Sequence, residues 1–405
     1  MVGFISIPGF LGFFPSAAHA QTHEHDTSSA SVAAGVQGVL LGTHVTPAMA
    51  GESRTEGYLT QPALMVHAAA LGFLDFSGTF VLEGLTLERG ELDHGIWGEG
   101  YVDRRHPHTY LHEAMLTARV EQPVMRGSVS AGKGFVPFGT DDPMSRPFVK
   151  YPANHHLAQI LERYVLIGGV GARYALFEGA LFNGDEPLNA SDMPSLDRFA
   201  DSWSLRASVF PATGVEVQGS FAQVESPEQP FGGGYDQQKW SLSGRVEVER
   251  AAGRWYALAE WARTEDFDDD VSAGARSSFL AEAAFSRGPM MVALRGERTL
   301  RPEEERTGNP FRTPWPHSDV HTLGATRWHI VTAHAERALT PWGVRLAPFL
   351  ELAFHHASDT EPLSAFKAER VYGSASIWSF SAGVRMRAGM VHGRMGRYGI
   401  ARTES

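Results

Sequence analysis

The chain has 405 residues and no cysteine, and 35 Lys and Arg against 46 Asp and Glu give a formal net charge of −11. The absence of cysteine excludes disulfide scaffolds, thiolate metal sites and cysteine nucleophiles. The acidic balance argues against nucleic-acid binding, because phosphate contacts need clustered basic side chains. After the first twenty residues no apolar run approaches the ~20 residues of a membrane-spanning helix, which excludes a helical membrane protein.

The first twenty residues have the features of an export signal. Residues 4–14 are apolar, and Ala18-His19-Ala20 fits the small-x-small pattern of a signal-peptide cleavage site. Pro8 and Pro15 disfavour the alternative of a buried N-terminal helix. No Lys or Arg precedes the apolar stretch, which leaves open a start further upstream. We expect a cleaved signal peptide over 1–20, followed by a disordered polar tail over 21–34.

From residue 35 onward, apolar and polar residues alternate with a period of two. In the stretch 240–249 (WSLSGRVEVE), for example, every second residue is apolar or Gly and the others are polar. This period places successive side chains on opposite faces of a β-strand, and no long stretch has helical spacing. The pattern predicts sixteen strands, over 35–48, 58–70, 73–86, 110–121, 126–137, 162–173, 175–183, 203–210, 214–224, 237–249, 254–264, 277–286, 289–300, 321–337, 343–357 and 374–388.

The predicted connections between strands alternate in length. Tight turns such as 211–214 and 250–253 follow every second strand, and the long polar connections are 49–57, 87–109, 138–161, 184–202, 225–236, 265–276, 301–320 and 358–373. Strands cross a membrane only as a closed barrel, because hydrocarbon leaves no partner for an unpaired backbone group. Bacterial barrels have short periplasmic turns and longer outer loops, whereas a soluble sandwich or propeller would not sort its loops by length. We therefore predict an all-β fold, a single transmembrane antiparallel β-barrel of about sixteen strands over 35–401, in the bacterial outer membrane.

Charged residues of the alternating strands fall on the face opposite to the apolar one. An Arg or Lys on the lipid face would cost ~2–4 kcal/mol at the bilayer midplane, so the charged face must look inward. A barrel of about sixteen strands is wide enough for a water-filled lumen. The predicted pore-lining residues are Glu83, Arg206, Arg245, Glu247, Glu260, Glu282, Arg345, Glu351, Arg385 and Arg387.

The pattern of strands, turns and loops resembles that of bacterial outer-membrane porins over nearly the whole chain after the signal segment. Residues 129–139 (VSAGKGFVPFG) are similar to the Gly-basic-x-x-x-Pro-Phe-Gly strand end of phosphate-selective-type porins. The resemblance implies a sixteen-stranded channel for small hydrophilic solutes, commonly trimeric. Two features depart from that family: the rows of arginine and lysine are missing, and no aromatic residue ends the chain. Tyr398 or Ile400 is expected to take the place of that terminal residue.

The connection over 139–163 is the most distinctive loop. Aromatic and proline residues such as Pro143, Phe148 and Tyr151 favour an ordered structure, and loops of this length are usually functional or disordered. The resemblance to porins implies that such a loop folds into the pore and narrows it, and the loop 87–109 is the alternative. The candidate constriction residues are Arg146, Lys150, Asn154, His155, Gln159, Glu162 and Arg163.

Histidines make one further candidate site. In an extended chain His106, His108 and His112 share a face, and imidazole suits Zn, Cu or Ni. Arg104 and Arg105 lie beside them and oppose a bound cation. These three histidines are weak metal candidates, and the plain alternative is that they are hydrated loop residues.

The sequence has no Gly-x-Ser-x-Gly elbow and no phosphate-binding loop, so we expect no catalytic residue, no cofactor and no enzyme. We predict a porin through which small hydrophilic solutes or ions diffuse passively. An outer-membrane metal-binding or efflux-associated barrel that uses its His-rich loops is the alternative. The expected partners are outer-membrane lipid and small solutes, with a homotrimer as the assembly that the resemblance implies. The solute and the ion selectivity stay open.

Overall fold

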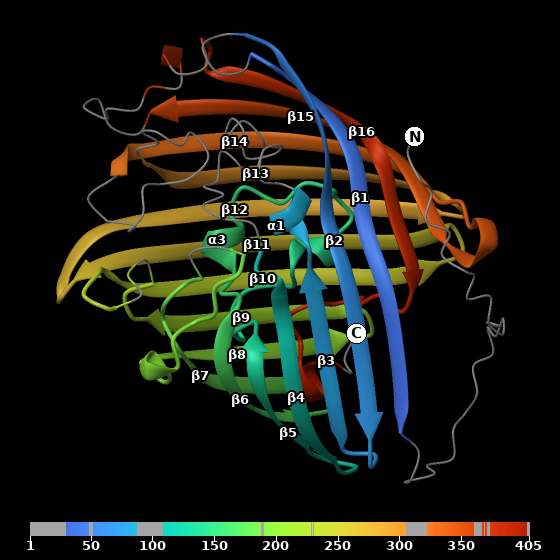
Figure 1. Cartoon of the computed structure of the whole chain (residues 1–405), viewed down its shortest axis with the longest axis vertical. Coiled ribbons are helices and arrows are strands. Elements are labelled where there is room, and N and C mark those ends of the chain that lie inside the picture. The colour runs from blue at the N-terminus through green and yellow to red at the C-terminus, as the bar shows by residue number, and fades with distance from the viewer. Residues whose placement is uncertain are drawn as a thin grey trace, which may run out of the picture.

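The computed structural model describes residues 30–47, 52–86, 108–187, 190–227, 229, 231–304, 322–359, 367, 369–370 and 373–402. Sixteen strands form one closed antiparallel barrel, in which each strand pairs with the next and β1 pairs with β16 (Figure 1). The strands are β1 (Ser31–Thr46), β2 (Arg54–Ala70), β3 (Leu74–Val81), β4 (Leu111–Glu121), β5 (Arg126–Gly134), β6 (Arg163–Ala172), β7 (Ala175–Phe182), β8 (Ser202–Ala212), β9 (Val215–Val224), β10 (Asp236–Arg250), β11 (Gly253–Asp268), β12 (Val271–Arg287), β13 (Met290–Glu304), β14 (Thr322–Arg337), β15 (Arg345–Asp359) and β16 (Ser376–Gly389). The prediction of a sixteen-stranded all-β barrel is confirmed.

Short helical turns lie in the connections. They are α1 (Glu83–Thr86), η3 (Pro143–Ser145), α3 (His155–Ala158), η4 (Leu196–Arg198), η6 (Pro341–Gly343) and η7 (Gly399–Ala401). Among the described residues, no helix has the length and apolar character needed to cross a membrane.

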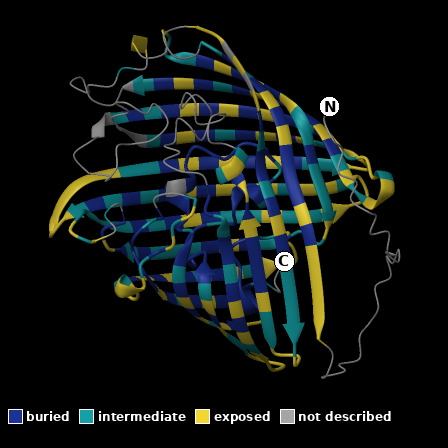
Figure 2. Ribbon diagram, in the orientation of Figure 1, coloured by how far each residue is buried: buried dark blue, intermediate teal, exposed yellow. Residues whose placement is uncertain are grey.

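The side chains of the barrel wall are sorted by polarity, with apolar residues outside. On β8, Leu205 is 56% exposed and Trp203 is 40% exposed, whereas their neighbours Ser204 and Arg206 are buried. Figure 2 shows this alternation as bands of buried and exposed residues along the strands. The arrangement is the reverse of a soluble protein, because the exposed large side chains are the apolar ones and the buried ones include many charges. An outer wall of this kind matches a hydrocarbon environment.

The prediction of a long connection over 265–276 is wrong, because β11 and β12 extend through most of this range. The two strands are joined only by Asp269 and Asp270, and Asp269 takes the positive φ of 51° that such a tight turn needs. The acidic stretch over 265–270 and the small residues over 272–275 weaken the alternation here, which is why the predicted strands end too early. An ion pair across the two strands, between Arg276 on β12 and Asp266 on β11, helps to hold this extension together.

The ends of the chain also differ from prediction. The predicted signal peptide over 1–20 lies outside the described residues, as does most of the predicted tail. Since β1 begins at Ser31, the last four residues of the tail predicted over 21–34 belong to the barrel. Strand β16 ends at Gly389, so neither Tyr398 nor Ile400 is the last residue of a strand. Both are buried, and whether one of them takes the place of the terminal aromatic residue stays a prediction.

Candidate functional site

The loop between β5 and β6, residues 135–162, lies inside the barrel. We call it the inner loop. None of its described side chains is exposed, although it is 28 residues long and connects two strands at the barrel rim. Gly139 makes the turn, with a φ of +62°, and a Cβ there would lie 1.6 Å from the carbonyl oxygen of Ala158. Only glycine fits this position, because the backbone is left-handed and the loop closes on itself there.

Apolar side chains of the inner loop pack on the inner face of the wall. Phe135, Phe138 and Ile160 join a cluster with Val165 on β6 and Phe182 on β7. Further along, the loop's other apolar side chains reach the opposite part of the wall. Val149 packs with Val39, Leu41, Tyr58 and Phe349, and Phe148 packs with Ala284 and Ala293. The loop therefore crosses the lumen instead of lining one side of it.

Side chains on β11, β12 and β13 form hydrogen bonds to the middle of the loop and fix its position. The side chain of Asn154 donates to Oε1 of Glu260 on β11 at 2.8 Å and to Oγ of Ser278 on β12 at 3.1 Å. The backbone N–H of Ala153 donates to Oε2 of Glu297 on β13 at 2.6 Å. Buried carboxylates of the wall thus accept from loop donors that would otherwise be unsatisfied away from water.

The strands β13, β15 and β16 hold the next part of the loop. Arg295 on β13 donates to the carbonyl oxygens of Lys150 and Tyr151 at 3.1 and 3.2 Å. The N–H of Val149 donates to Oε2 of Glu351 on β15 at 3.1 Å. On β16, Arg385 donates to the carbonyl oxygen of Pro147 at 2.8 Å, and Ser379 accepts from Nζ of Lys150 at 2.8 Å.

The predicted pore-lining residues fall into three groups. Glu260, Glu351, Arg385 and Arg245 are buried or half-buried and bind the inner loop. A second group pairs within the wall: Arg206 binds both carboxylate oxygens of Glu178 at 2.7 and 2.8 Å, and Glu282 accepts from the hydroxyl of Tyr256 at 2.6 Å. A third group is more accessible: Glu247 and Arg387 are partly buried, and Arg345 is exposed and donates to Glu336 at 3.2 Å.

Glu83 is not on a strand, so the prediction of a strand over 73–86 is wrong at this end. Strand β3 ends at Val81, and Glu83 begins the short helix α1. Its buried carboxylate accepts from Oγ1 of Thr60 at 3.0 Å and from the N–H of Gln61 at 2.9 Å, and it binds Nδ1 of His108 at 2.6 Å. The carboxylate therefore ties the connection after β3 to β2.

The predicted constriction residues are mostly buried anchors of the inner loop. Arg146 donates to the carbonyl oxygen of Asp141 at 3.1 Å, and the Gln159 side chain donates to the same oxygen at 2.7 Å. The ring of His155 packs edge-on against that of Tyr151, with centroids 5.4 Å apart. Arg163 is the first residue of β6 and binds Glu186, so it lies outside the loop that it was assigned to.

The lysine of the porin-like motif is also buried. Nζ of Lys133 donates to Oγ1 of Thr109 at 2.6 Å and to the carbonyl oxygen of Leu111 at 2.7 Å. Thr109 in turn donates from its N–H to Glu162 at 2.8 Å. Lys133 is thus part of the anchor at the base of the loop. The alternative constriction loop, 87–109, lies outside the described residues except for its last two positions.

The candidate histidines do not form a metal site in the described part of the chain. The rings of His108 and His112 stand edge to face, with centroids 4.8 Å apart. Each binds a carboxylate: His108 contacts Glu83 at 2.6 Å, and His112 contacts Glu162 at 2.7 Å. No group of three or more His, Asp or Glu suited to a metal ion occurs among the described residues. His106 lies outside them.

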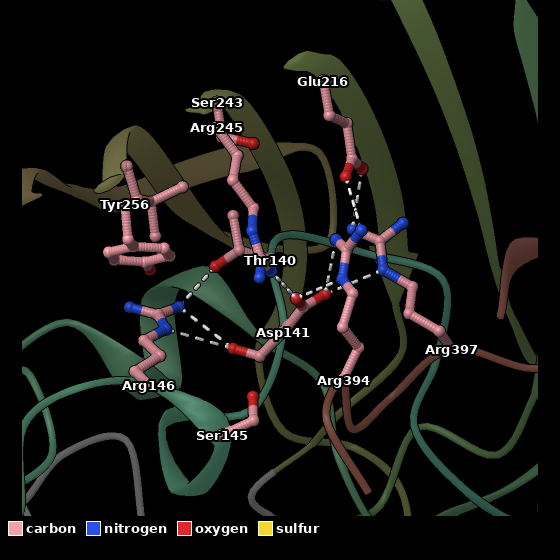
Figure 3. A pocket seen from close by; sticks show the side chains of 11 residues that line it. Thr140, Asp141, Ser145, Arg146, Glu216, Ser243, Arg245, Tyr256, Arg394 and Arg397 are labelled. Carbon is pink, nitrogen blue, oxygen red and sulfur yellow. Dashed lines mark hydrogen bonds and ion pairs between the residues drawn. The ribbon is translucent and has the colours of Figure 1, made fainter. Parts of the chain in front are cut away.

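A charged cluster that the sequence did not predict lies beside the loop (Figure 3). Asp141 of the inner loop contacts three guanidinium groups, those of Arg245 on β10 and of Arg394 and Arg397 after β16. Glu216 on β9 accepts from Arg394 at 2.7 Å and from Arg397 at 3.1 Å. Burial opposes the charge of Asp141, but the three arginines outweigh it and hold its pKa well below the usual range.

A small polar cavity of about 20 Å³, room for about one water molecule, lies between the inner loop, the residues after β16 and the wall from β9 to β11. It is lined by Thr140, Asp141, Ser145, Arg146, Glu216, Ser243, Arg245, Tyr256, Leu258, Arg394 and Arg397. The lining is therefore mostly polar, with charges of both signs. Arg394 and Arg397 follow the end of the alternating pattern, and no feature of the sequence marked them as functional residues.

Comparison with known proteins shows which solved structures share this fold. No family model matches the chain, and no curated protein sequence matches it. Among solved structures, the anion-selective porin of Comamonas acidovorans is similar with a TM-score of 0.52 and 11% identity, over 89% of this chain and 99% of that one. OprB of Pseudomonas putida has a TM-score of 0.54 and 9% identity, over 89% and 94%. The trimer form of OmpT, an outer-membrane protein of Vibrio cholerae, has a TM-score of 0.50 and 10% identity, over 89% and 100%.

These similarities extend over nearly the whole of each structure, although the sequences have diverged to about one identical residue in ten. The match therefore concerns the arrangement of the strands, and it agrees with the sixteen-stranded barrel and its apolar outer wall. The chain has the fold of the bacterial outer-membrane porins.

Proposed function

We propose that the protein is a porin of the bacterial outer membrane, through which small hydrophilic solutes or ions diffuse passively. The observation that carries this proposal is the combination of an apolar outer wall with a charged interior crossed by the inner loop. A barrel of sixteen strands is wide enough for an aqueous passage, and a loop folded into it sets the width.

The chemistry of such a channel is positioning and electrostatics, with no bond made or broken. Carboxylates such as Glu260 and Glu351 and arginines such as Arg245 and Arg385 face the same interior. Solutes would pass according to their size and their charge in the field between these groups. Because most of these charges are paired, we expect a modest preference between anions and cations. The residues around the small polar cavity beside the inner loop, Arg146 and Arg245 among them, are the ones proposed to contact the solute.

We also propose a homotrimer in lipid. The support is that one structurally similar barrel has a trimer form, and the shared fold is the only link between that assembly and this chain. Cross-linking of the purified protein in mild detergent, followed by mass measurement, tests this assembly separately from transport.

Swelling of liposomes that contain the purified protein tests the proposed function. Neutral sugars of increasing size should enter at rates that fall steeply with size, as expected for a sieve of fixed width. Empty liposomes give the baseline. Liposomes with correctly folded, heat-modifiable barrel that swell no faster than empty ones in the smallest sugar would show that the barrel is closed to solutes.

A further inference from the structure

The chain does not end with its last strand. Strand β16 ends at Gly389, and residues 390–402, which we call the C-terminal segment, turn back into the barrel (Figure 1). The N–H of Met390 donates to the carbonyl oxygen of Ala34 at 2.9 Å, which fixes the start of the segment next to β1. From there Met395 and the run 397–401 are buried. A loose overhang would be exposed instead.

The inner faces of β2 to β5 hold the far end of this segment. The hydroxyl of Tyr398 accepts from the N–H of Phe135 at 3.0 Å and donates to Oε2 of Glu113 on β4 at 3.1 Å. The N–H of Ile400 donates to Oγ of Ser128 on β5 at 3.2 Å. Arg402 donates to Ser77 on β3 and to Nδ1 of His67 on β2, the latter at 3.2 Å.

The middle of the segment is joined to the inner loop. Arg394 donates to both carboxylate oxygens of Asp141, at 2.6 and 2.9 Å, and Arg397 donates to one of them at 2.9 Å. The N–H of Asp142 donates to the carbonyl oxygen of Met395 at 3.3 Å. The Met395 side chain packs in a cluster that includes Met144 of the loop. Loop and segment therefore form one connected body inside the barrel.

This placement adds two positive charges to those that Arg245 of β10 and Arg146 of the inner loop already supply there. Arg394 and Arg397 border the small polar cavity beside the loop, and both contact Asp141 and Glu216 directly (Figure 3). Without them, Asp141 would keep its ion pair with Arg245, and Glu216 would lose both of the arginines that it binds. The local charge would then become less positive, which favours cations in a narrow passage.

We propose that the C-terminal segment is a second constriction element of the channel, and that Arg394 and Arg397 set its ion preference. The inference rests on the proposed function, because a constriction has a meaning only in a passage. It goes beyond a simple barrel with one inner loop, since the end of the chain also narrows the lumen.

Three variants, two of them full-length, test this in planar lipid bilayers. The first is the double substitution Arg394→Gln with Arg397→Gln. We expect it to raise the cation-to-anion permeability ratio at least about twofold in a salt gradient. Its matched control is Arg287→Gln, which removes an exposed arginine at the end of β12 and should leave the ratio unchanged. The second variant ends at Gly389, and its conductance should rise at least about twofold because the segment is gone.

The third variant keeps the fold intact. The chain has no cysteine, and Gly393 is exposed, with nothing within 4 Å of an added Cβ. Gly393→Cys therefore gives a single reactive thiol on the segment. A negatively charged thiol reagent should lower the current by about half or more, because it adds bulk and charge in the passage. Ala251→Cys, on the exposed turn after β10, should react without a change in current.

The outcomes separate the two proposals. An unchanged permeability ratio in the double variant, together with an unchanged current after modification of Gly393→Cys, would overturn the second constriction while the porin stands. If the shortened chain does not assemble, the double variant and Gly393→Cys still test whether the C-terminal segment narrows the passage. If neither the parent nor any variant conducts, the porin and the constriction both fall.

Discussion

Arg394 and Asp141 are 253 residues apart in the sequence and share two hydrogen bonds of 2.6 and 2.9 Å inside the barrel. The contact joins the end of the chain to the loop between β5 and β6, and Arg397 and Arg245 complete the shell around the carboxylate. One buried carboxylate therefore holds together three parts of the interior, which makes it a good place to test the architecture.

Asp141→Asn should destabilise the barrel. The substitution leaves the buried or half-buried guanidinium groups of Arg245, Arg394 and Arg397 facing a neutral amide, and breaking a buried ion pair costs up to about 3–5 kcal/mol. We expect a lower free energy of unfolding in urea with vesicle-embedded protein. Asp270→Asn, in the exposed turn between β11 and β12, is the matched control and should change little. Equal effects of the two substitutions would mean that Asp141 holds no arginines.

The same carboxylate predicts a specific pH dependence. The arginines hold the pKa of Asp141 below its usual value, so its stabilising effect is present above the unfolded-state pKa of ~3.9. The effect disappears only as the pH falls through the lower folded-state value. The difference in unfolding free energy between parent and Asp141→Asn should thus stay constant from pH 8 to about pH 5 and shrink only below about pH 4. A difference that vanishes between pH 7 and pH 5 would contradict this account.

Gly139→Ala should displace the inner loop. The added Cβ would meet the carbonyl oxygen of Ala158 at 1.6 Å, and alanine is strained at a φ of +62°. We expect a loss of stability above about 1 kcal/mol, with a change in single-channel conductance. Gly244→Ala on β10 is the control, because nothing lies within 4 Å of its added Cβ. An unchanged conductance in Gly139→Ala would argue that the loop does not shape the passage.

Lys133→Met should separate stability from selectivity. The ammonium group is buried and already donates to Thr109 and to the backbone at Leu111, so it has no direct part in attracting solutes. We expect a loss of about 1–3 kcal/mol from the unsatisfied partners and an unchanged reversal potential in a salt gradient. A shift toward cations in this variant would instead assign Lys133 to the ion path.

Leu205→Arg tests the orientation of the wall. Leu205 is an exposed apolar residue in the middle of β8, and an arginine at the bilayer midplane costs ~2–4 kcal/mol. Phe231→Arg, in the connection after β9 and 93% exposed, is the control and should cost little. If both substitutions are tolerated equally in vesicles, then the apolar wall does not face lipid.

The sequence predicts the barrel well because a two-residue period and the sorting of loop lengths are local properties of strands in a membrane. It also predicts which face of β11 and β15 carries Glu260 and Glu351, since side-chain direction follows from the same period. The period does not predict which other side chains a residue contacts. Glu83 was assigned to a strand because nothing in its neighbours signals that β3 ends at Val81 and that Thr60 and His108 bind its carboxylate.

The interior was predictable only in part for the same reason. The length and aromatic content of the inner loop favoured an ordered loop in the lumen, but the contacts of Asp141 depend on where two irregular segments meet. Arg394 and Arg397 lie after the alternation ends, in a stretch with no periodic signal. Their role emerges only when the closed barrel brings β16 beside β1 and turns the end of the chain inward.

Single-channel recording of the purified full chain in planar bilayers tests the central claim most directly. An apolar wall in lipid around a wet, charged interior predicts discrete, stable current steps that scale with salt concentration and persist across voltages of either sign. A protein that inserts into the bilayer as a folded barrel and carries no current at any voltage would contradict the claim.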